Sequence, residues 1–189
     1  MTYPVVKVTT HGWIVLAVDP GIRGCGVALF KAGRLEQAAY VKNTAKSGNR
    51  AAEAECMAHA VAKWLYDGRR APDELAVEWP QIYVKQLRAG KLKKKADPND
   101  LLALCGVDAA ITARLGGVPT TSYLPHEWKG SMEKEPTHVR IEGRLLPTEL
   151  RVAAEACEAA GSLEHNVKDA IGIGLHHVGR FERKRVIAY

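Results

Sequence analysis

Short apolar and β-branched runs predict three consecutive β-strands near the start of the chain. The run Gly12–Asp19 (GWIVLAVD) stops at the turn signal Pro20-Gly21, and a second run follows at Gly26–Lys31 (GVALFK). After the turn Ala32-Gly33-Arg34, a third strand is expected over Leu35–Val41. Connections this short join antiparallel neighbours, so the pattern predicts an antiparallel meander.

Helical and extended patterns then alternate. Apolar residues at three- and four-residue spacing predict a helix over Asn49–Asp67, with Gly68 as a stop. A short strand, Leu75–Glu78, ends at the breaker Trp79-Pro80. Asp97 as N-cap and Pro98 in the first turn predict a second helix that runs to about Leu115.

The remaining sequence predicts one more strand and two more helices. Val118–Leu124 is expected to be extended, and Pro125–Leu146 is interpreted as loops and short turns because it has no convincing period. Helices are expected over Thr148–Ala160 and His165–Gly179, and the basic residues from Arg180 to Arg185 as a solvated helix end. This order predicts an α/β fold with a five-stranded mixed sheet flanked by helices, in a single domain spanning 1–189.

Composition favours a folded protein with a polyanionic partner. Hydrophobic residues are 47% and charged residues 25% of the 189 positions, and the net charge is +6, which is weak support for nucleic-acid binding. The four cysteines lack zinc-ligand spacing and are interpreted as buried thiols in a reducing compartment. No signal pattern is found, and the apolar run Ile14–Val18 is too short to span a bilayer, so a cytoplasmic location is expected.

Two acids end predicted strands and are candidates for chemistry. Asp19 follows Val18 directly, and Glu78 follows Val77. The plain alternatives are that Asp19 caps a turn and that Glu78 is a solvated edge residue. If the two strands are neighbours, both carboxylates lie at one edge of the sheet.

A third acid, Asp169, lies near the start of the last helix. His165 and Asn166 share its helical face at four- and three-residue spacing, although an acid in a first turn is also explained by the helix dipole. Gly172 and Gly174 would let this helix approach the sheet closely. Three carboxylates with a histidine or an asparagine would make an oxygen-rich site suited to Mg²⁺ or Mn²⁺.

Several segments together resemble the RuvC-like Holliday junction resolvases of the ribonuclease H-like superfamily. Val15–Ala28 (VLAVDPGIRGCGVA) resembles their first-strand motif, Val77-Glu78 their fourth-strand acid and Asp169-Ala170 their C-terminal helical acid. Tyr123–Gly130 (YLPHEWKG) resembles the segment after their fifth strand in phage-type members. The matches keep the family's order over about Leu16–His177.

The resemblance implies a ribonuclease H-like fold and a magnesium-dependent endodeoxyribonuclease that acts in DNA recombination and repair. It implies two Mg²⁺ ions, replaceable by Mn²⁺, held by Asp19, Glu78 and Asp169. Bacterial members carry a fourth acid where this chain has Asn166, and some relatives use histidine, so the choice between His165 and Asn166 stays open. If His165 is not a ligand, it could act as a general base.

Basic and aromatic residues near these acids are candidate DNA contacts. A basic stretch follows Glu78, and two further lysines follow the fifth strand; the alternative is that such charges are simply solvated. Two aromatic residues could stack on an opened base or could pack in the core. The proposed DNA-binding residues are Lys85, Arg88, Lys91, Lys93, Lys94, Lys95, Lys129 and Lys134, with Trp79 and Tyr83 as the aromatic pair.

The resemblance implies a homodimer that resolves four-way junctions, located in the host cytoplasm if the chain is phage-encoded. A broader flap or fork nuclease and a non-catalytic DNA-binding scaffold remain alternatives. An actin-like ATPase is disfavoured because 189 residues leave no room for a second domain with a second phosphate loop.

Overall fold

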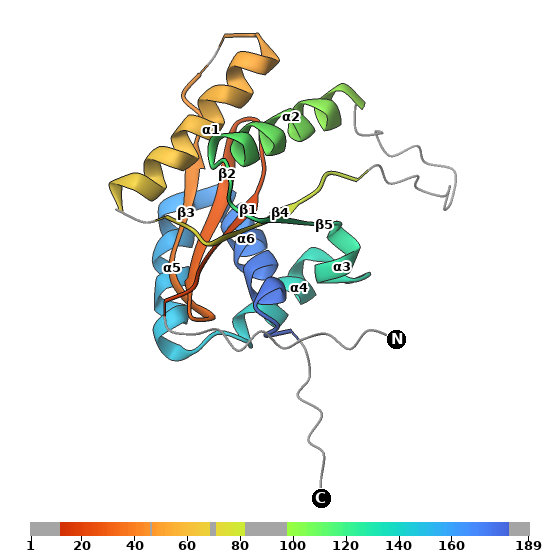
Figure 1. Cartoon of the computed structure of the whole chain (residues 1–189). Helices are drawn as coiled ribbons and strands as arrows, with labels where there is room; N and C mark the ends of the chain where they lie inside the picture. Colours follow the sequence, from red (N-terminus) through yellow and green to blue (C-terminus); the bar gives the residue numbers. More distant parts are fainter. Residues whose placement is uncertain (1–11, 46, 69–70, 82–97, 182–189) are drawn as a thin grey trace, which may run out of the picture.

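Five strands form one mixed sheet in the order β3-β2-β1-β4-β5 (Figure 1). The computed structural model describes residues 12–45, 47–68, 71–81 and 98–181. β1 (Ile14–Asp19), β2 (Gly24–Lys31) and β3 (Arg34–Lys42) form an antiparallel meander. β4 (Glu74–Glu78) pairs in parallel with β1, and β5 (Thr120–Tyr123) in parallel with β4. The predicted α/β fold and its mixed sheet are therefore confirmed.

Alternating residues of each central strand enter two separate cores. In β1, Val15 and Ala17 face one core, whereas Leu16 and Val18 face the other, and all four are fully buried. This two-sided burial explains why the strand is a continuous apolar run instead of an alternating one.

Two helices cover the face of the sheet that Leu16 and Val18 enter, which is called the first face (Figure 1). α1 (Arg50–Asp67) buries Met57, Val61 and Leu65, and α2 (Pro98–Arg114) packs against it with Val107 and Ile111. α1 begins after Asn49, whose side chain accepts hydrogen bonds from the next turn, while Asp97 lies outside the described residues.

The second face is covered by α5 (Pro147–Ala160) and α6 (Glu164–His177), joined by the short 3-10 helix η1 (Gly161–Leu163). The interpretation of Pro125–Leu146 as loops and turns was wrong, because this segment contains α3 (Pro125–Lys129) and α4 (Lys134–Glu142). Both are too short to display a clear helical period. They are held by burying one large side chain each, Trp128 and Ile141.

Helix α6 lies unusually close to the sheet. A Cβ atom at Gly26 of β2 would come within 1.8 Å of the backbone oxygen of Asn166, and one at Gly174 within 2.1 Å of the Phe30 ring. Glycine at both positions therefore sets the distance between helix and sheet. The predicted role of Gly174 in close packing is confirmed.

A buried ion pair ties the end of α6 to α5. Glu149 is 2% exposed and accepts hydrogen bonds from the Arg180 guanidinium at 2.7 and 2.8 Å and from the Leu35 amide at 2.8 Å. The expectation of a solvated basic end was therefore wrong for Arg180. The other basic residues of that segment lie outside the described residues.

The cysteines only partly match the expectation of buried thiols. Cys25 and Cys157 are buried, but Cys56 is exposed and Cys105 is intermediate. Both of these lie on helices of the first face, whose outer sides are open to solvent.

None of the helices within the described residues is both long enough and apolar enough to cross a membrane.

Replacing Gly26 with alanine should lower the free energy of unfolding by about 1–3 kcal/mol or more, because the new methyl group overlaps the α6 backbone. Urea denaturation of the two proteins measures the difference. Gly106→Ala is a matched control, because its Cβ would meet only Ala54 at 3.9 Å. Alanine favours the helix over glycine, so this variant should have a free energy of unfolding about 0.5–1 kcal/mol above that of wild type. Equal stability of Gly26→Ala and wild type would contradict the close approach of α6.

Glu149 should make stability depend on pH. Burial raises the pKa of Glu149, but hydrogen bonds from Arg180, Leu146 and Leu35 outweigh it, and the net pKa is lowered. An acid whose pKa is lowered by folding stabilises the folded protein at pH values above its unfolded pKa of about 4.3. This stabilisation is lost as the pH falls through the pKa of the folded state. Glu149→Gln should thus cost about 3 kcal/mol at pH 7 and progressively less below about pH 4.

Urea denaturation at several pH values checks this, with Glu155→Gln on the exposed side of α5 as the matched control. A difference between Glu149→Gln and wild type that stays constant with pH would contradict the ion-pair account.

Candidate active site

Parallel pairing brings the two strand-terminal acids to the same edge of the sheet. Val18 of β1 is in register with Val77 of β4, and the next residue on each strand is Asp19 and Glu78. The prediction that these two strands are neighbours is confirmed, and with it the placement of both acids at one edge.

The third acid reaches this edge through α6. Asp19 pairs with Gly26, and Gly26 lies directly beneath the backbone of Asn166. Asp169 is one turn further along the same helix, so the close approach of α6 directs it toward the strand acids. The carboxylates of Asp19, Glu78 and Asp169 lie near enough to influence one another electrostatically.

Like charge and burial together oppose ionisation of Asp19. Burial raises the pKa of Asp19 well above the usual aspartate range, and the carboxylates of Glu78 and Asp169 raise it further. Lys129 and Lys134 lower this pKa, but only in part. A cluster of this kind is costly to ionise without a cation to balance it.

Glu78 is held by two donors from α3. The indole Nε1 of Trp128 donates a hydrogen bond to Glu78 Oε2 at 2.7 Å, and Lys129 Nζ contacts the same oxygen at 3.4 Å. Burial raises the pKa of Glu78, whereas Lys129 and Trp128 lower it and Asp169 raises it. The net pKa is above the usual value.

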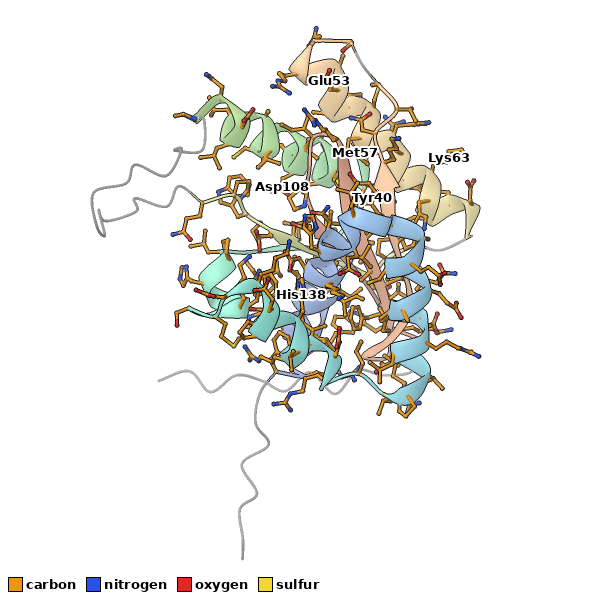
Figure 2. The ribbon with its side chains drawn as sticks, turned by 180° about the vertical axis from the view of Figure 1, so that it is seen from behind. Tyr40, Glu53, Met57, Lys63, Asp108 and His138 are labelled. Atoms are coloured by element: carbon orange, nitrogen blue, oxygen red, sulfur yellow. The ribbon has the colours of Figure 1, made fainter. Side chains whose placement is uncertain are left out.

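Asp169 is contacted by a histidine that the sequence reasoning missed. His138 Nε2 lies 3.4 Å from Asp169 Oδ1, and the two side chains are 12% and 20% exposed. His138 is on the side of α4 that faces α6 (Figure 2). Because α4 was interpreted as loop, no periodicity placed His138 on a face toward the acids.

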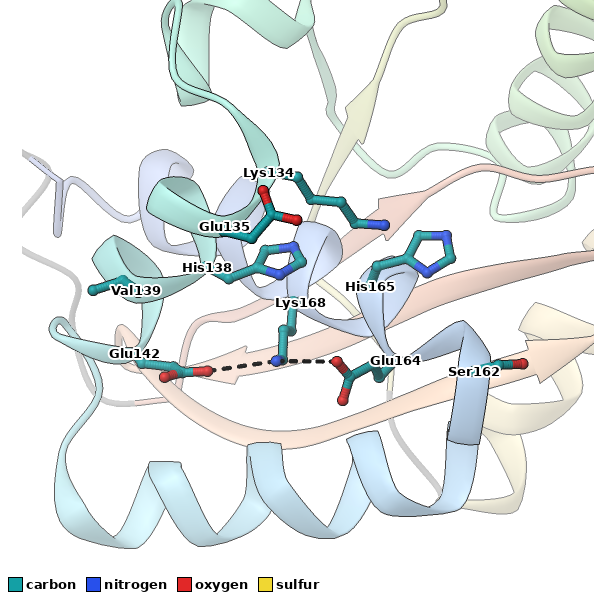
Figure 3. A pocket seen from close by; sticks show the side chains of 9 residues that line it. All are labelled: Lys134, Glu135, His138, Val139, Glu142, Ser162, Glu164, His165 and Lys168. Carbon is teal, nitrogen blue, oxygen red and sulfur yellow. Dashed lines mark hydrogen bonds and ion pairs between the residues drawn. The ribbon is translucent and has the colours of Figure 1, made fainter.

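A pocket opens beside this contact, between α4 and α6 (Figure 3). Lys134 and His138 line it from α4, and His165 and Lys168 from α6, with Lys168 held between Glu142 and Glu164. His165 therefore lies in a pocket that borders Asp169.

Asn166 is placed differently from His165. Its amide Nδ2 donates to the Leu163 backbone oxygen at 3.4 Å, at the start of its own helix.

The predicted DNA contacts are only partly described. Trp79 follows Glu78 and is 41% exposed, so it is not a core residue. Lys129 and Lys134 lie beside the carboxylates. The other predicted DNA-binding residues, Tyr83, Lys85, Arg88, Lys91, Lys93, Lys94 and Lys95, lie outside the described residues.

The donor types suit a hard divalent cation. Three carboxylates that repel one another are the oxygen ligands that Mg²⁺ and Mn²⁺ prefer. In the described part of the chain, no three Asp, Glu, His or Cys side chains are already arranged to hold one ion. Trp128 engages one oxygen of Glu78 and His138 one oxygen of Asp169. The site fits a cation through its donor types and the mutual repulsion of its acids.

The chain is similar in sequence to a known nuclease over most of its length. No family model matches the chain. The crossover junction endodeoxyribonuclease RuvC of Parafrankia sp. (strain EAN1pec) is 26% identical over 172 residues, covering 88% of this chain and 86% of that protein.

Two solved structures share the fold. The structure of T. thermophilus RuvC in complex with a Holliday junction substrate has a TM-score of 0.57 at 22% identity, covering 87% of this chain and 92% of that chain. The yeast mitochondrial Holliday junction resolvase Ydc2 has a TM-score of 0.54 at 12% identity, covering 92% and 82%. The ribonuclease H-like fold expected from the sequence is thereby confirmed.

Neutralising Asp19 should stabilise the metal-free protein. Asp19→Asn removes a buried charge that Glu78 and Asp169 repel, so its urea midpoint in EDTA at pH 8 should exceed that of wild type. The exposed Asp100→Asn on α2 is the control and should leave the free energy of unfolding within about 0.5 kcal/mol of wild type. A destabilised Asp19→Asn would show that the Asp19 carboxylate is satisfied by the protein alone.

Proposed function

We propose that the chain is a RuvC-like endodeoxyribonuclease that resolves four-way DNA junctions. The observation that carries the proposal is the gathering of Asp19, Glu78 and Asp169 from two parallel strand ends and one helix. Sequence likeness to a curated RuvC over most of both chains supports the junction as substrate.

We assign the three carboxylates as ligands of divalent cations, two Mg²⁺ ions with Mn²⁺ able to replace them. When bound, such ions would activate water and stabilise the leaving oxygen of a phosphodiester. The raised pKa of Asp19 supports this assignment, because a cation between the acids would relieve their repulsion. Asp19 is proposed to be shared between the ions because both other acids act on it.

The fourth group of the site is assigned to His165 or Asn166. His165 lines the pocket beside Asp169, which supports it as a ligand or as a general base toward the attacking water. The side-chain Nδ2 of Asn166 donates a hydrogen bond to the Leu163 backbone oxygen, but the side-chain carbonyl oxygen can still bind a cation.

Cationic residues around the acids are proposed to position the DNA backbone. Lys134 lines the pocket next to the site, and Lys129 lies between Glu78 and the surface with 27% of its side chain exposed. Phosphate contacts of this kind fix the register of a substrate without reading its sequence. Trp79, exposed directly after Glu78, is proposed to stack on a base.

We further propose that the chain acts as a homodimer in the cytoplasm, in the host's if it is phage-encoded. A four-way junction is two-fold symmetric, and paired nicks need two active sites related by the same symmetry.

Substituting a ligand should abolish cleavage while sparing binding. In Mg²⁺, Asp19→Asn and Asp169→Asn should cut a labelled four-way junction at least about a hundredfold more slowly than wild type. Losing a residue that only hydrogen-bonds to a metal ligand already lowers activity about 10–100-fold, so losing the ligand should cost at least as much. Gel shifts in EDTA should show that both variants still bind the junction.

Asp100→Asn, on the exposed start of α2, is the matched control and should cleave normally. Unchanged cleavage by both site variants would place the active site elsewhere. Parallel assays on flap, fork and duplex DNA separate a junction resolvase from a broader nuclease, and wild-type binding without any cleavage would indicate a scaffold.

A further inference from the structure

The indole of Trp128 makes a buried polar contact that core packing alone does not require. Trp128 is 1% exposed, and its only polar atom donates to Glu78 Oε2 at 2.7 Å. An indole N–H is a donor only, and burying one without an acceptor is destabilising. The ring and the carboxylate therefore fix each other's orientation.

Both donors of α3 meet the same carboxylate oxygen. Lys129 Nζ also contacts Oε2, at 3.4 Å, and lies 4.8 Å from the centre of the Trp128 ring. Both donors engage Oε2, so a cation would have Oε1 to bind. A carboxylate locked at one oxygen loses less rotational freedom when the other binds.

Helix α6 holds the other side of the indole. A Cβ atom at Gly172 would lie 2.5 Å from Trp128 Cζ3 and 2.8 Å from Ile141 Cδ1, so the ring fills the space that this glycine leaves. Asp169 is three residues earlier on the same helix. The same helix thus carries one acid and supports the ring that orients another.

We propose that Trp128 is a positioning residue for the active site: its indole N–H, wedged against Gly172, holds Glu78 in the orientation that binds a divalent cation. The inference rests on the proposed nuclease function. It assigns to α3 a role in metal binding, in addition to the role of Lys129 near the DNA.

Removing the N–H while keeping an aromatic ring tests the proposal. Trp128→Phe in the full chain should bind Mn²⁺ roughly 10–100-fold more weakly than wild type in titration calorimetry, the range typical of outer partners of a metal ligand. Trp64→Phe, on α1 and remote from the acids, is the matched control and should bind Mn²⁺ as wild type does. Mn²⁺ affinity of Trp128→Phe within twofold of wild type would overturn the proposal.

A double-substitution cycle separates positioning from packing. If Trp128 acts through Glu78, Trp128→Phe should weaken Mn²⁺ binding far less in a Glu78→Gln background than in wild type. Equal effects in both backgrounds would mean that the ring only packs, and would overturn the proposal.

A second pair of variants tests the contact between Gly172 and the Trp128 ring without replacing Trp128. Gly172→Ala should weaken Mn²⁺ binding as Trp128→Phe does, whereas Gly106→Ala on α2, where a Cβ would meet only Ala54 at 3.9 Å, should not. Equal losses in the two alanine variants would overturn the proposed role of the Gly172 wedge.

The hydrogen bond can also be observed without metal, should the variants fold poorly. In ¹⁵N-edited spectra of the metal-free protein, Glu78→Gln should shift the Trp128 indole resonance, assigned as the signal that is lost in Trp128→Phe, and leave that of Trp64 in place. An unshifted Trp128 indole signal would overturn the proposal, whatever happens to the signal of the neighbouring Trp79. A wild type that binds no Mn²⁺ but shows this shift would instead contradict the proposed metal-dependent function.

Discussion

The close approach of α6 to β2 is the contact on which the rest of the site depends. The backbone of Asn166 lies where a side chain at residue 26 would begin, and residue 26 is the sheet partner of Asp19. Only glycine there allows the helix to bring Asp169 to the edge where β1 and β4 end. Fold and site therefore share one steric requirement.

The same closeness has an energetic cost that the surrounding packing must offset. Burial already disfavours charge at this edge, and the pKa of Asp19 is raised by that burial and by the two neighbouring carboxylates. Fully buried apolar residues on both faces of the sheet, together with the Glu149–Arg180 pair at the far end of α6, stabilise the arrangement. Strain of this kind is common at sites built to bind charged ligands.

Much of the fold was predictable because its signals are local and strong. Apolar runs ending in turn residues gave the meander, and Asn49 marked the start of α1. α3 and α4 were missed because helices of five and nine residues bury too few side chains to show a period. The buried partner of Arg180 was missed because Glu149 is 31 residues away in sequence and on another helix.

The site was predictable in its acids but not in the groups around them. Asp19 and Glu78 each end an apolar strand, which the sequence displays directly. Trp128 and His138 reach Glu78 and Asp169 only through tertiary packing of the two short helices, which no spacing rule encodes. The roles of His165 and Asn166 stay predictions, and the basic stretch after Glu78 lies outside the described residues.

The length of α3 has a consequence for when the site comes into being. A helix of five residues is not stable on its own, so α3 depends on the packing of Trp128 against Gly172 of α6. The hydrogen bond that orients Glu78 therefore depends on tertiary packing and not on α3 alone. A chain in which this packing is incomplete would have the acids without their geometry, so the proposed activity would require the fully packed protein.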